Sequence, residues 1–176
     1  CCVGGNSGEA GQSGGIVKIS GAWSFYPMVV KWAEEYRSVK PKVRIDISAG
    51  GAGKGMADVL SDVVDIGMVS REIFPAEVEK GAWWISVTRD AVVPVFNADN
   101  PVFSAVVKKG VTMETLRRIW ITGEATSWSS LSGIDDLSPI SVYTRSDACG
   151  AAQTWAACLG GNQEDHVKAL SRRGFT

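Results

Sequence analysis

The stretch VRIDISAGGAGKGMADVLSDVVDIGMVSR, residues 43–71, decides the fold. Apolar and polar residues alternate at its start, as in a half-buried strand, and a run rich in glycine then breaks this pattern. Apolar residues recur at every third or fourth position of residues 56–63, which is the spacing of one helix face. Residues 66–69 form a second apolar run. The stretch therefore predicts a strand, a glycine turn, a helix and a second strand.

The glycine turn at residues 49–55 opens directly into the expected helix. Its small side chains leave backbone N–H groups and the positive end of the helix dipole facing outward, which suits an anion. The turn matches neither common nucleotide motif. Gly55 stands where a P-loop needs Ser or Thr, and Met56 stands where a dinucleotide-binding turn needs glycine. A tight turn without a ligand remains the alternative on this motif alone.

The flanking sequence continues the alternation of strands and helices. We expect further strands over residues 16–20, 83–87, 91–96 and 140–144, and helices over residues 27–39, 74–80, 112–123 and 151–159 and from residue 162 onward. A polar loop is expected over residues 127–138. Trp32, Trp120 and Trp155 fall on apolar helix faces, so we expect them in the core, and Met113 is expected to point inward. This order predicts an α/β fold with a largely parallel sheet.

Small-residue turns follow an expected strand at residues 21–24, 49–55 and 145–150. Parallel strands bring such turns to the carboxyl edge of the sheet, where α/β proteins bind ligands. Three helix N-termini at one place would make an anion-selective pocket. Arg71 and Arg145 follow strands at the same edge, and each could bind an oxyanion or form a surface ion pair.

Composition and residue types exclude several classes of protein. The chain has 18 Lys and Arg against 19 Asp and Glu, and this balance argues against a nucleic-acid binder. No apolar run is long enough to span a membrane. No Cys, His or carboxylate cluster has metal-ligand spacing, and Ser24 and Ser70 have no evident His partner. His166, the only histidine, is expected at the surface. These features favour a binding protein over an enzyme.

The cysteines fall into two groups. Cys1 and Cys2 precede a run of small and polar residues that ends at residue 15. This pattern is typical of a mature lipoprotein, in which the N-terminal Cys carries the lipid, although an arbitrary chain boundary would look the same. Cys149 and Cys158 would lie about 13 Å apart along one helix, so we expect free thiols.

Several segments together resemble the phosphate-binding lipoproteins of phosphate ABC transporters, which have the type II periplasmic-binding-protein fold. They are SGAWSFYPMVVKWAEEY, ISAGGAGKGMADVLSDVVDIGMVSREI, AVVPVFNADNP, VTMETLRRIWITGEATSW and YTRSDACGAAQTW, and they cover nearly all of residues 16–160 in the family's order. The resemblance implies a tether over residues 1–15, the N-terminal part of a first lobe over 16–87 and an incomplete second lobe over 88–176. The missing part could belong to a longer chain or to another chain, or the fold could be reduced.

The resemblance also implies an oxyanion site between the lobes. The implied ligand residues are Ser24 with the Phe25 amide, Ala52 and Gly53 in the glycine turn, Ser70 and Arg71, and Arg145, Asp147, Cys149, Gly150 and Ala151 in the last turn. Ala52, Cys149 and Ala151 stand where the family has hydroxyls, and their loss could weaken phosphate binding by orders of magnitude. A Cys149 thiolate would also repel an anion.

Arg71 stands where some members have an aspartate that accepts the phosphate proton. This change would favour a fully ionised anion or one of different shape. The sequence therefore predicts an extracytoplasmic protein, lipid-anchored at Cys1, that captures phosphate or a similar oxyanion for an ABC permease and needs no cofactor. Two alternatives are a degenerate member with a sensory or protein-interaction role and an enzyme that uses Cys149 as its nucleophile.

Overall fold

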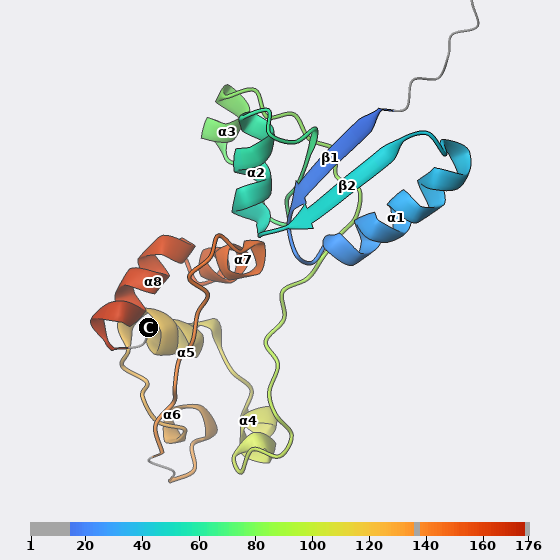
Figure 1. Cartoon of the computed structure of the whole chain (residues 1–176). Helices are drawn as coiled ribbons and strands as arrows, with labels where there is room; N and C mark the ends of the chain where they lie inside the picture. The colour runs from blue at the N-terminus through green and yellow to red at the C-terminus, as the bar shows by residue number, and fades with distance from the viewer. Residues whose placement is uncertain (1–14, 136–137, 175–176) are drawn as a thin grey trace, which may run out of the picture.

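The computed structural model describes residues 15–135 and 138–174, so the expected tether before Gly15 and the lipid site at Cys1 lie outside the described residues. Its elements in chain order (Figure 1) are β1 (Ile16–Gly21), α1 (Tyr26–Val39), β2 (Arg44–Ala49), α2 (Ala52–Leu60), β3 (Ile66–Met68), α3 (Pro75–Glu79), α4 (Phe103–Lys109), α5 (Met113–Arg117), a π-helical turn η1 (Arg118–Thr122), α6 (Ser129–Ser132), α7 (Gly150–Cys158) and α8 (Gln163–Arg172). In these ranges no helix is both long and apolar enough to cross a bilayer.

A parallel sheet with the strand order β2-β1-β3 organises the first half of the chain. Gly21 at the end of β1 lies level with Ala49 of β2 and with Met68 of β3. The three strands therefore end at one edge of the sheet, and the turn that follows each of them starts there. The predicted β-α-β-α-β order and the parallel sheet are confirmed.

Helix α1 covers this sheet with only part of its apolar face. Val29 and Ala33 are buried, and Pro27 lies in the first turn, where its missing N–H removes no helical hydrogen bond. Trp32 and Tyr36 are each 45% exposed, so the prediction that Trp32 lies in the core is wrong. Helix α1 packs along β2, and the side of the helix that carries Trp32 and Tyr36 stays open.

The helices of the second half enclose a separate core. Its buried members are Val102, Val106, Ile119, Ala125, Leu131, Ile140, Val142 and Leu170. Trp120 packs against this cluster, as predicted, and its ring meets that of Trp155 edge to face at 5.6 Å. Aromatic pairs in this arrangement add to the stabilisation that burial provides.

Three expected strands, over residues 83–87, 91–96 and 140–144, are not formed. Residues 82–96 run as extended chain between α3 and α4 (Figure 1), and Trp83 and Val95 are 81% and 89% exposed. Ile140 and Val142 are buried, but no strand pairs with them among the described residues. An apolar run becomes a strand only when a neighbour satisfies its backbone N–H and C=O groups.

Several local features of the second half follow the sequence. The Thr112 hydroxyl accepts a hydrogen bond from the Thr115 amide at 3.1 Å and caps α5, and Gly123 ends the helical segment in a left-handed conformation. Cys149 and Cys158 are free thiols, as predicted. Two expectations are wrong. Met113 is 42% exposed, and helix α6 lies within the expected polar loop.

His166 was expected at the surface but is only 4% exposed. It shares a face of α8 with Leu170, one turn later, and this face packs into the protein. Its Nε2 has no hydrogen-bond partner among the described residues. Burial lowers the pKa of His166, because an imidazolium loses its hydration there, although the nearby Asp165 carboxylate acts in the opposite direction.

We expect the protein to lose stability as the pH falls below about 6.5. The unfolded chain takes up a proton at His166 at a higher pH than the folded protein does, because burial lowers the pKa of the folded imidazole, so the free energy of unfolding falls by at most about 1.4 kcal/mol per pH unit. Urea unfolding between pH 7.5 and pH 5.5 measures this slope. His166→Gln should flatten it, since the chain has no other histidine. An unchanged slope in the variant would contradict the assignment.

Candidate functional site

A hollow of about 260 Å³ lies where the three strands end. Its lining residues are Ala22, Trp23 and Ser24 from the first turn, Gly51 and Ala52 from the glycine turn, Ser70 after β3, Asp90 and Val92 from the extended segment, and Arg145, Cys149, Gly150, Ala151 and Thr154 from the last turn and α7. Figure 1 shows α7 beneath the end of α2. The structure thus brings the three small-residue turns together, although no strand precedes the third.

The last turn packs closely against the glycine turn. The Gly53 amide donates to the Ala148 carbonyl at 3.2 Å. Gly51 has a φ of +96°, and a Cβ at this position would lie 2.6 Å from the Ala148 oxygen. Only glycine combines this backbone conformation with this approach. The glycine turn therefore brings the Arg145–Cys149 segment against the sheet edge.

Gly150, the first residue of α7, makes the other close approach. A Cβ on this residue would lie 2.6 Å from the Ser70 carbonyl oxygen and would also meet the Ser70 hydroxyl. The backbone of α7 consequently touches the segment that leaves β3. This contact places the N-terminus of α7 at the hollow, beside the Ser70 side chain.

Gly150→Ala should open this contact. Because α7 or Ser70 must shift, we expect a loss of about 1–3 kcal/mol in the free energy of unfolding, together with weaker anion binding. Urea unfolding and calorimetric titration measure the two effects. Gly15→Ala is the matched control, since a Cβ there meets nothing within 4 Å. Equal behaviour of the two variants would show that the contact does not shape the site.

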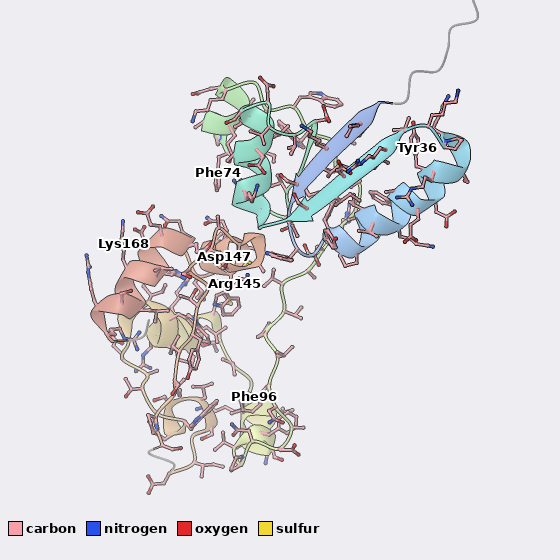
Figure 2. All side chains as sticks on the ribbon, in the orientation of Figure 1. Tyr36, Phe74, Phe96, Arg145, Asp147 and Lys168 are labelled. Atoms are coloured by element: carbon pink, nitrogen blue, oxygen red, sulfur yellow. The ribbon has the colours of Figure 1, made fainter. Side chains whose placement is uncertain are left out.

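Arg145 lies at the hollow with its guanidinium held by Asp147. Nε and Nη2 each donate to one carboxylate oxygen at 2.7 Å, and Figure 2 shows the two side chains together beside α7. The hydrogen bonds from Arg145 keep the pKa of Asp147 below its usual value. Since guanidinium has five N–H groups and Asp147 accepts from two of them, the others can reach an anion. Asp147 itself does not line the hollow and serves to orient Arg145.

Gln163 at the start of α8 holds this turn in place through its side-chain amide. Its Nε2 donates to the carbonyl of Arg145 at 3.0 Å and to that of Asp147 at 2.7 Å. Gln163 was not predicted from the sequence. A side-chain amide at the beginning of a polar helix gives no sign of a contact 16 to 18 residues back in the chain.

Three hydroxyl groups line the hollow, those of Ser24, Ser70 and Thr154. None of the three donates to or accepts from another described side chain or backbone group. Each is therefore available to a ligand. Thr154 was not predicted, but it lies one turn after Gly150 on α7, and the i, i+4 spacing could have identified it.

Backbone amides at two helix N-termini add to the hydrogen-bond donors that an anion in the hollow could use. The first amides of α2 and α7 have no intrahelical acceptor, and both helices direct the positive end of their dipole to this edge. Two predicted amide donors are already used, since Gly53 donates to Ala148 and Phe25 donates to the Ala22 carbonyl at 3.2 Å. Neither residue lines the hollow. The amides of Ala52, Gly150 and Ala151 remain as candidates.

Arg71 lies outside the lining of the hollow. Its guanidinium donates to the two carboxylate oxygens of Glu77 at 2.6 and 3.0 Å, and it lies 4.2 Å from the centre of the Phe74 ring. The hydrogen bonds from Arg71 lower the pKa of Glu77. Since the side chains of Arg71 and Glu77 are only 10% and 15% exposed, this ion pair joins the end of β3 to α3.

Asp90, which was not predicted from the sequence, brings a carboxylate to the hollow. One of its oxygens accepts from the Ala91 amide at 2.8 Å, and no cation pairs with it among the described residues. Ala52, Cys149 and Ala151 also line the hollow, and two of them contribute methyl groups there instead of hydroxyls. No group of metal-binding side chains occurs in the part of the chain that the structure describes.

The family model and the relatives found by comparison with known proteins agree with one another. A family model described as a PBP superfamily domain matches residues 6–174. Phosphate-binding protein PstS 2 of Streptococcus agalactiae is 33% identical over 70% of this chain and 40% of its own length. Phosphate-binding protein PstS of Bacillus subtilis is 31% identical over 86% of this chain and 52% of its own. The chain thus spans about half the length of these curated relatives.

A solved structure supports the same assignment. A Clostridium perfringens protein, described as a phosphate ABC transporter substrate-binding protein with bound phosphate, superposes with a TM-score of 0.70 and 30% identity. The match covers 85% of this chain and 58% of the other. The parallel sheet and the order of elements described above are those of a type II periplasmic-binding-protein fold.

Proposed function

Since the chain belongs to the PBP superfamily, whose model matches residues 6–174, we propose that it captures phosphate or a similar oxyanion for an ABC importer. The observation that carries this proposal is the meeting of three turns at one hollow with Arg145 and unpaired hydroxyls. The relatives named above are phosphate-binding proteins, and one was solved with phosphate. The role is binding and delivery, without catalysis and without a cofactor.

The donors of the hollow suit a tetrahedral oxyanion. Arg145 supplies charge and a planar fork, Ser24, Ser70 and Thr154 supply hydroxyls, and the N-terminus of α7 supplies amides. Such charge-assisted hydrogen bonds are the stronger ones in proteins. A volume of 260 Å³ holds about eight or nine waters at 30 Å³ each, so a five-atom anion fits and keeps part of its hydration.

Asp90 gives this site a preference among oxyanions. A carboxylate repels a fully ionised anion such as sulfate, but it accepts a hydrogen bond from an anion that keeps a proton, such as hydrogen phosphate. Arg71, which would have favoured a fully ionised anion, is paired with Glu77. We therefore expect phosphate to bind in preference to sulfate, and Asp90→Asn to reduce this preference in a competition titration.

Isothermal titration with phosphate, sulfate, molybdate and tungstate tests the function. At least one of these anions should bind with a Kd below about 10 µM, which corresponds to about 7 kcal/mol. Absence of heat with all four would remove the transport role and leave the degenerate member with a sensory or protein-interaction role. Alkylation of Cys149 by iodoacetamide much faster than that of a free thiol would instead favour the enzyme.

The proposed place of action is outside the cytoplasm, with the lipid anchor at Cys1 and an ABC permease as partner. The support is the sequence of residues 1–15 and the names of the relatives. Residues 16–87 and 88–176 correspond in this proposal to the two lobes, with the oxyanion between them. Metabolic labelling with a radioactive fatty acid tests the anchor, and a Cys1→Ala variant should lose the label.

A further inference from the structure

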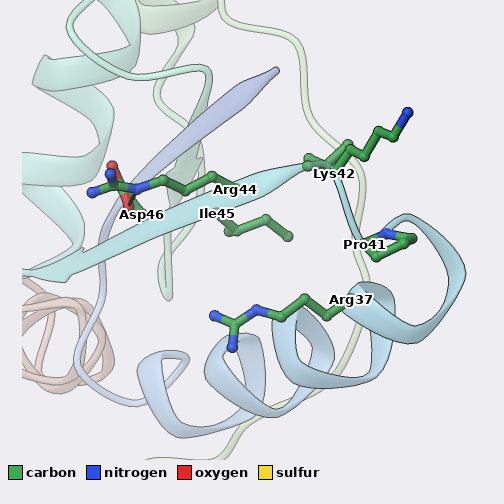
Figure 3. Close-up of a pocket in the computed structure, with 7 residues that line it drawn as sticks. Arg37, Pro41, Lys42, Arg44, Ile45 and Asp46 are labelled. Carbon is green, nitrogen blue, oxygen red and sulfur yellow. Dashed lines mark hydrogen bonds and ion pairs between the residues drawn. The ribbon is translucent and has the colours of Figure 1, made fainter. Parts of the chain in front are cut away.

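A second hollow lies at the opposite end of β2 from the candidate site. Its volume is about 370 Å³, and the end of α1, the following loop and the start of β2 line it. Figure 3 shows Arg37 on α1, Lys42 on the loop, and Arg44 beside Asp46 on the strand. Three of the side chains that line this hollow are thus cationic and one is anionic.

The positive charge of this region is only partly neutralised. Arg44 pairs with Asp46 at 2.8 Å, but Arg37 and Lys42 form no ion pair with another described residue. With Lys40, the ten residues from Arg37 to Asp46 contain four cations and one carboxylate, a net charge of +3 in a chain whose net charge is −1. The region is therefore a local basic surface on an otherwise acidic protein.

Helix α1, which carries Arg37 near its end, also carries an exposed apolar stripe. Trp32, Tyr36 and Val39 are 45%, 45% and 68% exposed and are spaced i, i+4, i+7, so they share one side of the helix. The carboxylates of the same helix, Glu34 and Glu35, are both within ion-pair distance of Lys31. Aromatic and apolar side chains next to basic ones are typical of helices that lie in a membrane interface.

We propose that this basic surface, formed by residues 37–46 with the α1 stripe of Trp32, Tyr36 and Val39, docks on a bilayer of anionic phospholipids. The path of the chain supports this partner. The Arg44 amide donates to the Gly15 carbonyl at 2.9 Å, and Ile16 pairs with Arg44 in the sheet. The described part of the chain therefore begins, at Gly15, beside this surface. The docked protein keeps its candidate oxyanion site at the far end of the strands, away from the bilayer.

This inference goes beyond the proposed function and needs no acyl group. The test uses the full chain without lipid and vesicles of phosphatidylcholine, with and without phosphatidylglycerol, in a sedimentation assay. We expect binding to the anionic vesicles only, and weaker binding as the salt concentration rises. Since each basic residue near such a surface contributes about fivefold, Arg37→Gln/Lys42→Gln should lower the partition coefficient about 25-fold.

Lys108→Gln/Lys109→Gln is the matched control, because it removes the same charge from exposed positions on α4. It should bind vesicles like the unchanged protein. Equal binding by the two double variants, binding to neutral vesicles, no binding, or sedimentation without vesicles would each overturn the proposal. Phosphate titration of both variants separates this result from the oxyanion function, since neither change touches the candidate site.

Discussion

Arg145→Met should weaken oxyanion binding more than any other single substitution at the hollow. The variant loses the only cation that lines the hollow among the described residues, together with its free N–H donors. Charge-assisted hydrogen bonds are worth about 1.5–3 kcal/mol each, so a loss of about 2–4 kcal/mol corresponds to a Kd about 30 to 1,000 times higher. Titration with the anion that binds best to the unchanged protein measures this ratio.

Two further variants serve as controls for the effect of Arg145→Met on the Kd. Arg118→Met removes an arginine that is also ion-paired and half-exposed, with Glu124, but lies on η1 outside the hollow. It should leave the Kd unchanged. Arg145→Lys keeps the charge without the planar fork and should fall between the two. If Arg145→Met bound the anion as tightly as Arg118→Met, Arg145 would not be a ligand.

Cys149→Ser/Ala151→Thr should strengthen binding. Both residues line the hollow, and neither is fully buried, so the new hydroxyls have room to turn toward an anion. Two added hydrogen bonds, each partly offset by the immobilisation of its side chain, should lower the Kd for phosphate about 10- to 100-fold. The physical reason is that a thiol is a weak donor and a methyl group is none.

The same pair of substitutions on the outer side of α7 serves as the control. Cys158→Ser/Ala157→Thr changes exposed residues near the end of this helix and should leave the Kd unchanged. Tighter binding by the Cys149 and Ala151 double variant alone would locate the anion at the N-terminus of α7. A Kd that did not fall would mean that the anion, if it binds, does not reach this end of the hollow.

The first half of the fold could be predicted because its signals are local. Alternation over residues 44–49, the glycine break and the helix spacing that follows each depend on neighbours a few positions away. The apolar runs at 83–87 and 91–96 give an equally clear signal, yet a strand also needs a partner, and that partner is not specified within the run. His166 was misplaced for a similar reason, because seven of the ten residues of α8 are polar or charged and hide its inward face.

The candidate site likewise contains some residues that could be predicted from local sequence and others that could not. The first two turns could be predicted because the parallel strands β1 and β2 place their ends at one edge. The third turn and Arg145 were predicted from a strand over residues 140–144 that is not formed, and the contact between Gly53 and Ala148 brings them to the same edge. Asp90 and Gln163 could not be predicted, since each reaches the site from a segment without a recognisable motif. Arg71 shares the strand-then-arginine pattern with Arg145, and its partner Glu77 is six residues away. The pattern alone does not say which arginine a nearby carboxylate will hold.

A crystal structure of the protein grown with the tightest-binding oxyanion tests the central claim most directly. We predict one anion in the hollow between residues 21–24, 49–55 and 145–151, within hydrogen-bond distance of Arg145, of the Ser24 or Ser70 hydroxyl and of an amide at the start of α7. An anion bound elsewhere, or an empty hollow at concentrations well above the measured Kd, would contradict the account.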